Sequence, residues 1–352
     1  MSGNSFGKAL VLTTFGESHG VAVGGMLDGL PSNLDIDLSF IQSELNRRRP
    51  GLDFFSSPRK EDDIIEILSG IYDGKTTGAP VGFLVYNRNQ NSSDYDHLKD
   101  VYRPSHADFT YHRKYGIRDP RGGGRSSARE TVARVAGGAF AKLLLLTKNI
   151  KVNAWISQIG HYEIPDPSSR EQYEIAVHNK KTISDPIILA FLEKLKSDGD
   201  TAGGIISCSI TGVPAGIGEP VFDKLHADLA KAMLSINSAK GFDYGSGFRG
   251  VSMKGSEHND RFIKQEDRIT TLTNHSGGIQ GGISNGAEIY FRVAFKPVST
   301  LMLHQETVNT AGEPVIIEGR GRHDVCVLNR ALVVVEAMAA LVIGDHLIRS
   351  DE

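Results

Sequence analysis

The sequence predicts an α+β fold in which antiparallel sheets pack on helices. Residues 287–295 alternate apolar and polar side chains, which is the period-two pattern of a strand with one covered face. Such alternation is typical of antiparallel sheets, because buried parallel strands tend to be apolar on both faces. Residues 127–146 instead repeat apolar side chains with the period of a helix. The polar stretch 160–186 is the most linker-like, and without another change in composition we expect one domain over residues 1–352.

The remaining elements are predicted from local patterns. The expected shorter strands are 81–86 and 204–211, and the expected helices are 39–49, 127–146, 222–236 and 329–348. At the start of the first helix, Ser39 and Gln42 have the spacing of a capping box. One apolar stripe of the second helix contains Val132, Val135, Ala136, Ala139, Phe140 and Leu143.

Bulk composition argues against several classes of protein. The formal net charge of −3 argues against a general nucleic-acid or membrane-surface binder. No run approaches 18 consecutive apolar residues, and the first residues lack the basic and apolar regions of a signal peptide. We therefore expect no membrane span and a cytoplasmic location. Cys208 and Cys326 lie far apart without the spacing of metal ligands, so we expect reduced, buried thiols and no metal site.

Two glycine motifs resemble nucleotide-binding loops. Residues 245–250 (GSGFRG) match the dinucleotide fingerprint, but a polar, glycine-rich stretch precedes them and a poor helix start follows. Residues 69–76 approach a P-loop, but Ser69 stands where the first glycine is required. We therefore favour turns over a Rossmann site or a P-loop at these positions.

Three other segments carry residues suited to chemistry, and the first is 13–20 (TTFGESHG). Gly16 and Gly20 flank His19, which can present its ring to a ligand and, when protonated, stabilise a phosphate. A surface turn with a solvated histidine explains the same residues equally well.

The second segment, 103–134, holds eight Lys or Arg residues against three Asp or Glu residues. Gly122–Gly124 should form a loop, and Ser126 or Ser127 should cap the helix that follows. A glycine loop, a helix N-terminus and flanking arginines together favour phosphate binding, and the alternative is a solvated basic face. A second basic group, which a polyanionic ligand could share, contains Arg47, Arg48, Arg49 and Arg59.

The third segment lies near the C-terminus. Residues 274–282 (NHSGGIQGG) expose their backbone, and 296–300 (KPVST) ends the best strand with a cation and two hydroxyls. In 319–324 (GRGRHD) two arginines stand beside Asp324, just before the last helix. Asp324 is therefore a candidate acid or base, and the alternative is a residue near the helix N-cap that pairs with Arg322.

Together these segments resemble the chorismate synthase family. The family's signatures match GESHG, GGGRSSARET and GRHD, together with RRRPG at 47–51, RPSHADFTY at 103–111, GVPAGIGEPVFD at 212–223, SINSAKG at 235–241 and NHSGG at 274–278. The resemblance implies a lyase of the shikimate pathway, which removes the 3-phosphate and a C6 hydrogen from 5-enolpyruvylshikimate 3-phosphate by anti-1,4-elimination to give chorismate. The reaction is redox-neutral, yet the family requires reduced FMN. The family fold is a β-α-β sandwich with two antiparallel sheets, and its members are homotetramers.

The resemblance also implies roles for individual residues. His19, His106 and Asp324 would be catalytic. His19 would assist departure of the phosphate, His106 would lie near N1 of the flavin, and Asp324 would help to remove the C6 proton, directly or through N5 of the flavin. The FMN site would comprise Arg125, Ser126, Ser127, Asn237, Ser238, Gly281, Lys296, Pro297, Val298, Ser299, Thr300 and Arg322.

The same resemblance assigns two further ligands. Arg48 matches a position assigned to NADPH, but Phe54 stands where the family usually has a second arginine for that nucleotide. Arg49 and Arg129 would bind the substrate. Whether the chain reduces its own flavin or uses an external reductant is left open.

Two other functional classes remain open. An ordinary flavin oxidoreductase would consume NAD(P)H as it reduces its substrate. A non-enzymatic phosphate- or nucleic-acid-binding protein is supported only by the basic segment 103–134. Nucleic acid would favour a broader basic surface with interleaved aromatic residues.

Overall fold

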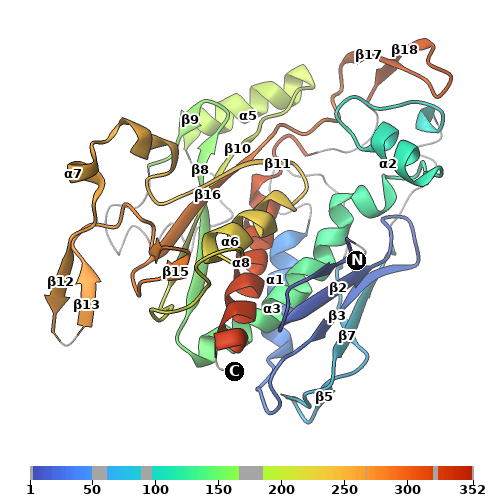
Figure 1. The fold of residues 1–352 in the computed structure, drawn as a ribbon. Coiled ribbons are helices and arrows are strands. Elements are labelled where there is room, and N and C mark those ends of the chain that lie inside the picture. Colours follow the sequence, from blue (N-terminus) through green and yellow to red (C-terminus); the bar gives the residue numbers. More distant parts are fainter. Residues whose placement is uncertain are drawn as a thin grey trace.

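The computed structural model describes residues 3–49, 62–88, 97–165, 185–266, 268–319 and 324–350, and it shows a layer of helices between two sheets (Figure 1). The first sheet has the strand order β1 (Ser5–Phe6), β2 (Val11–Phe15), β3 (Ala22–Asp28), β7 (Val81–Tyr86) and β4 (Glu66–Ile67). The second sheet has the strand order β11 (Ala239–Tyr244), β16 (Ile289–Phe295), β10 (Gly204–Thr211), β8 (Lys151–Ile159) and β9 (Tyr162–Glu163). Within these ranges the strands of both sheets pair in antiparallel fashion, which confirms the expected α+β sandwich.

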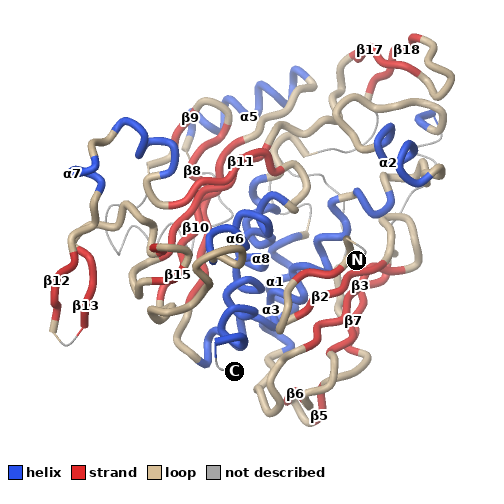
Figure 2. The backbone as a smooth tube through the Cα atoms, viewed as in Figure 1, coloured by secondary structure: helices blue, strands red, loops and turns tan. Residues whose placement is uncertain are grey.

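The other elements form the helical layer or lie at the periphery of the molecule (Figure 2). The helices between the sheets are α1 (Leu38–Arg48), α3 (Thr131–Thr147), α6 (Leu225–Leu234) and α8 (Leu328–Ser350). The peripheral helices are α2 (Asp108–Tyr115), α5 (Pro186–Asp198) and α7 (Gly255–His258). The small hairpins are β5 (Ile71–Tyr72) with β6 (Lys75–Thr76), β12 (Phe262–Gln265) with β13 (Arg268–Thr271), β14 (Ile279–Gln280) with β15 (Ile283–Ser284), and β17 (His304–Val308) with β18 (Pro314–Glu318).

The helix α8 forms the centre of the core. It packs so closely on α3 that a Cβ added to Gly138 would lie 2.3 Å from the Cβ of Ala337. By length and composition α8 could span a membrane, with a mean hydropathy of 2.0, but 94% of its apolar window is buried inside the protein. We therefore identify α8 as a core helix.

The predicted strands agree with the structure. The strand expected at 287–295 is β16, which begins two residues later and alternates buried and half-buried side chains along its length. It pairs with β10 on one side and β11 on the other, so its apolar face covers the helical layer. The strands β7 and β10 begin and end at the predicted residues.

The helix predicted over 39–49 is α1, shifted by one residue, but its predicted capping box is wrong. Its cap is Asp37, whose Oδ1 accepts hydrogen bonds from the backbone amides of Ser39 (2.8 Å) and Phe40 (3.0 Å). Gln42, expected to complete a capping box with Ser39, instead donates from Nε2 to the carbonyl of Asp63 (3.0 Å). An aspartate two residues earlier is an equally good cap, and the local pattern could not separate the two positions.

The predicted helix over 127–146 begins later than expected. The 3-10 turns η2 (Gly124–Ser126) and η3 (Ala128–Glu130) precede α3, and Ser127 caps η3 by accepting a bond from the amide of Arg129 (3.3 Å). The expectation that Ser126 or Ser127 caps this segment is therefore confirmed for Ser127. The helices α2 and α5 were not predicted.

The glycine motif at 245–250 and the two cysteines agree with the expectations from the sequence. The 245–250 motif follows strand β11, and its second half forms the 3-10 turn η4 (Gly247–Ser252) between antiparallel elements. This geometry confirms the turn and excludes a Rossmann unit at this position. Cys208 and Cys326 are both buried, as expected.

A buried charge cluster joins the helical layer to the second sheet. Arg47, which the sequence grouped with ligand-binding arginines, donates from Nη1 to Glu44 (2.6 Å) and to Glu336 (2.7 Å). Lys142 also pairs with Glu336 (2.7 Å), and that carboxylate accepts a bond from the amide of Ala154 (3.1 Å). Arg47 therefore serves the core rather than a ligand.

Candidate active site

A cavity of about 480 Å³ lies where α2, the turns η2 and η3, the end of β16 and the start of α8 meet. The predicted site residues that line it are His106, Ser126, Ser127, Asn237, Ser238, Lys296, Val298, Ser299, Thr300 and Asp324. These residues come from five distant stretches of the sequence, so the fold brings together most of the predicted site.

The geometry around His106 defines which ring nitrogen carries the proton. Its Nδ1 lies 3.0 Å from the carbonyl oxygen of Pro104, and a carbonyl can only accept, so Nδ1 carries the hydrogen. Its Nε2 lies 3.2 Å from Oγ1 of Thr300, so in the neutral ring the threonine hydroxyl donates to it. Burial, followed by the charge of Arg103, lowers the pKa of His106 to about 4, with Lys296 acting in the same direction. His106 is therefore neutral near pH 7.

Charged side chains around His106 give this wall of the cavity a positive character. Arg103 makes a bidentate ion pair with Asp108, with Nε–Oδ2 and Nη2–Oδ1 distances of 2.7 Å. Burial alone would raise the pKa of Asp108, but the hydrogen bonds and charge of Arg103 outweigh it and lower that pKa. Lys296 donates to the carbonyl of Ser105 (3.0 Å) and contacts Ser299, and burial with the nearby Lys240 lowers its pKa.

The glycine loop separates the cavity from His19. Gly122 has a φ of +66°, and a Cβ at this position would lie 2.6 Å from Cδ2 of the His19 ring. His19 itself is only 7% exposed, and the neighbouring Ser18 donates its amide to the carbonyl of Gly124 (3.4 Å). Only a glycine allows the loop 122–124 to pack on the histidine in this way. The surface-turn interpretation of His19 is therefore wrong.

Arg125 lies outside the cavity and holds the glycine loop to the segment that contains Gly16. Its Nη1 donates to the carbonyl of Gly16 (3.1 Å), and its Nη2 donates to Oγ1 of Thr14 (2.7 Å) and Oδ1 of Asn4 (3.2 Å). The guanidinium thus ties η2 to the end of β2. Arg125 does not line the cavity, although sequence reasoning placed it in the FMN site.

Asp324 lines the cavity and pairs with a residue that sequence reasoning missed. Its Oδ2 lies 2.6 Å from Nη1 of Arg330, in the first turn of α8. The same arginine donates from Nε to the carbonyl of Arg48 (3.2 Å). The expected partner, Arg322, lies outside the described residues. Arg330 lies six residues after Asp324, in a helix that the sequence predicts. Nothing in the local sequence, however, favours Arg330 over Arg322 as the partner of Asp324.

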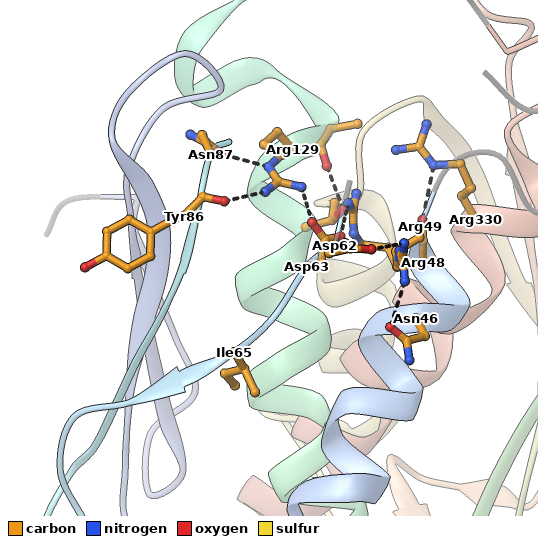
Figure 3. Close-up of polar contacts among 12 residues, drawn as sticks. Asn46, Arg48, Arg49, Asp62, Asp63, Ile65, Tyr86, Asn87, Arg129 and Arg330 are labelled. Carbon is orange, nitrogen blue, oxygen red and sulfur yellow. Dashed lines mark hydrogen bonds and ion pairs between the residues drawn. The ribbon is translucent and has the colours of Figure 1, made fainter. Parts of the chain in front are cut away.

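A cluster of arginines and aspartates lies beside the cavity (Figure 3). Arg48 is 2% exposed and pairs with Asp63, which is fully buried (Nη2–Oδ2 2.6 Å). Arg129 pairs with the other oxygen of Asp63, and Arg49 pairs with Asp62. Burial alone would raise the pKa of Asp63, but the charges of Arg48 and Arg129 outweigh it and lower that pKa.

The structure leaves a few predicted residues apart from the cavity. Gly281 lies in the turn between β14 and β15, and Pro297 does not line the cavity although its neighbours do. Phe54 and Arg322 lie outside the described residues. The lining residues to which the sequence gave no individual role are Leu98, Arg103, Ser105, Ala107, Ala128, Lys240, Gly319 and Val327.

Comparison with known proteins finds similar chains over nearly the whole length of this one. A family model described as chorismate synthase matches residues 10–348. The chorismate synthase of Christiangramia forsetii is 56% identical over 354 residues, covering 99% of each chain. The chorismate synthase of Parabacteroides distasonis is 56% identical over 351 residues, covering 98% of each chain. A crystal structure of a chorismate synthase aligns with a TM-score of 0.76 at 29% identity, covering 98% of this chain and 93% of that one.

The matches extend along nearly the full length of this chain and of the relatives. They exclude an ordinary flavin oxidoreductase and a non-enzymatic binding protein as interpretations of the sequence. The chain belongs to the chorismate synthase family, the carbon–oxygen lyases that convert 5-enolpyruvylshikimate 3-phosphate to chorismate in the shikimate pathway.

Proposed function

We propose that the cavity beside α2 binds reduced FMN together with the phosphorylated substrate, and that its residues perform the elimination. The observation that carries this proposal is the meeting of Lys296, His106 and Asp324 in one cavity of about 480 Å³. The family uses reduced FMN, which supports the cofactor. A cation, a neutral imidazole and a carboxylate provide for phosphate binding, hydrogen bonding and proton removal within the same space.

The residues present fit a flavin mononucleotide. Asn237 donates from Nδ2 to the carbonyl of Ser126 (3.0 Å), while its buried Oδ1 has no hydrogen-bond partner among the described residues. A buried acceptor of this kind is satisfied by an N–H group such as a flavin ring offers. Lys296 and Lys240 offer positive charge to a phosphate, and Thr300 supplies a hydroxyl beside them.

Each catalytic residue has a proposed task that its surroundings support. Reduced FMN, when bound, supplies the electron density that the weakly acidic C6 position needs. Lys296 would stabilise negative charge on a phosphate group. His106, whose Nδ1 is held by the carbonyl of Pro104, would present Nε2 to the ligand as an acceptor in exchange for the hydroxyl of Thr300. Asp324 would take up the C6 proton, with Arg330 fixing one of its oxygens.

His19 and the substrate arginines complete the proposed site. His19 would assist departure of the phosphate, since Gly122, having no side chain, leaves the histidine ring close to the cavity wall. Arg49 is proposed as a substrate ligand, with Asp62 as its exchangeable, largely exposed partner. Arg129 is proposed as a second ligand by resemblance, although protein groups already engage its guanidinium.

We also propose that NADPH, as a reductant of the flavin, acts from outside this cavity. Arg48, which the resemblance assigns to NADPH, is only 2% exposed and is paired with Asp63, and this supports a structural role. A homotetramer in the cytoplasm is proposed from the family resemblance. Exposed apolar side chains at Phe248, Val251 and Ile269, around η4 and the β12–β13 hairpin, support association through that region.

An anaerobic assay with 5-enolpyruvylshikimate 3-phosphate tests the proposed site. Chorismate should form with reduced FMN, and none should form with oxidised FMN. Lys296→Met should raise the dissociation constant of FMN by about 10- to 150-fold, the range for loss of one charge-assisted hydrogen bond. Unchanged FMN affinity in that variant would place the cofactor elsewhere.

A further inference from the structure

The loop that carries His19 is held by an asparagine that lies just after β7. Asn87 donates from Nδ2 to the carbonyl of Glu17 (3.0 Å) and to the carbonyl of Gly20 (2.9 Å). These two carbonyls flank His19 on either side in the sequence. One side-chain amide therefore grips both ends of the four-residue turn that presents the histidine.

The same amide is fixed from behind by Arg129. Oδ1 of Asn87 accepts a bond from Nε of Arg129 (2.8 Å). Carbonyls only accept and a guanidinium only donates, so the amide of Asn87 can satisfy its three partners in one orientation and not in the flipped one. These three hydrogen bonds therefore fix the orientation of the Asn87 amide.

Arg129 in turn is anchored to a buried carboxylate. It pairs with Asp63, which is fully buried and which also binds Arg48 of α1. Figure 3 shows Asn87, Arg129, Asp63 and Arg48 in succession, and they come from the end of β7, from η3, from the segment before β4 and from α1. A buried ion pair of this kind resists distortion, because separating it would leave uncompensated charge in the core.

We propose that Asn87 is a positioning residue for the elimination, acting through His19 and anchored by the pair of Arg129 and Asp63. In this arrangement the guanidinium of Arg129 donates hydrogen bonds to Asp63, to Asn87 and to the carbonyl of Tyr86. Asn87 transmits that fixed position to the turn, and the turn holds the His19 ring against Gly122. The inference rests on the proposed role of His19 in phosphate departure.

Asn87→Asp is the decisive variant. Aspartate keeps the shape of the side chain and keeps an acceptor for Arg129, but it replaces the two donated hydrogen bonds with repulsion from Glu17 O and Gly20 O. A displacement on the order of 1 Å in a catalytic group can cost about 100-fold in rate, so kcat should fall by roughly 10- to 100-fold. The KM for the substrate and the dissociation constant of FMN should each change by less than about threefold, because Asn87 does not line the cavity and the aspartate still accepts from Arg129.

Asn149→Asp is the matched control. It makes the same change of charge beyond the C-terminal end of α3, about 25 Å from the N-terminal end by helical rise. This variant should have wild-type kcat. If Asn87→Asp does not fold, Asn87→Ala removes the two donors without adding charge and is measured in its place.

A double-mutant cycle with His19→Ala separates positioning from general damage. If Asn87 acts through His19, Asn87→Asp should produce no further fall in kcat in the His19→Ala background. Effects that multiply, or a wild-type kcat in Asn87→Asp alone, would overturn the role of Asn87. A wild-type kcat in His19→Ala would instead overturn the proposed role of His19, and no turnover by the wild type with reduced FMN would overturn the proposed function itself.

Discussion

Replacing His106 with asparagine should change how the stability of the ligand-free protein depends on pH. The amide nitrogen of asparagine can take the place of Nδ1 and donate to the carbonyl of Pro104, which accepts from His106 at 3.0 Å. The variant therefore keeps the local backbone contact and removes the titrating ring. The change isolates the cost of burying a histidine beside Arg103 and Lys296.

The sign and size of the effect follow from the lowered pKa. Above pH 6.5 the ring is neutral in both the folded and the unfolded chain, so it contributes nothing to the pH dependence. Between pH 6.5 and about 4 the unfolded chain binds a proton at His106 that the folded chain does not, so the free energy of unfolding falls as the pH falls. A shift from 6.5 to about 4 corresponds to at most about 3.5 kcal/mol, at about 1.4 kcal/mol per pKa unit.

Urea unfolding at a series of pH values measures this effect. Between about pH 7 and about pH 4, the variant should lose roughly 2–3 kcal/mol less stability than the wild type. Buried carboxylates with lowered pKa values, such as Asp63 and Asp108, destabilise both proteins in acid and cancel in the comparison. A stability difference that is independent of pH would refute the reasoning and show that His106 titrates alike in the folded and unfolded chains.

Two further substitutions test the cavity. Gly122→Ala should destabilise the protein by more than the roughly 1–2 kcal/mol of left-handed backbone strain, because its Cβ would meet His19, and turnover should fall with it. Gly74→Ala, at a similar φ but with nothing within 4 Å of its Cβ, measures the strain alone in thermal unfolding, and equal losses would show that the contact with His19 is harmless. Asp324→Asn should retain the fold and FMN affinity while kcat falls by about 10²–10⁴, and a wild-type kcat would reduce Asp324 to a structural partner of Arg330.

The cavity residues could be predicted because their local chemistry is unusual. Glycine runs such as Gly122–Gly124 are costly unless their positive φ angles are used, and here all three residues adopt them. The hydroxyls and cation of 296–300 end a strand whose alternation was clear, so their place at the edge of the second sheet followed. Residues that touch a ligand are concentrated in such loops, and a sequence displays them directly.

The supporting residues could not be predicted in the same way. Asn87 follows a correctly predicted strand and Asp63 stands in an acidic run, and nothing near either position indicates Arg129. Their partners lie 42 and 66 residues away, in elements that meet only when the first sheet closes on the helical layer. Periodicity reports which face of an element is buried, but it does not report which element lies opposite.

The arginines at 47–49 are consecutive in the sequence but do not form a basic surface. Successive helical residues point about 100° apart, so neighbours in sequence do not share a face. Arg47 consequently turns into the core to Glu336, Arg48 turns to Asp63, and Arg49, just past the end of α1, turns toward solvent and Asp62. The three guanidiniums pair with different carboxylates, so the run adds little net charge to any single surface. Local charge predicts an anion site when the cations are spaced to share a face, or when a loop such as 122–127 gathers backbone amides beside them.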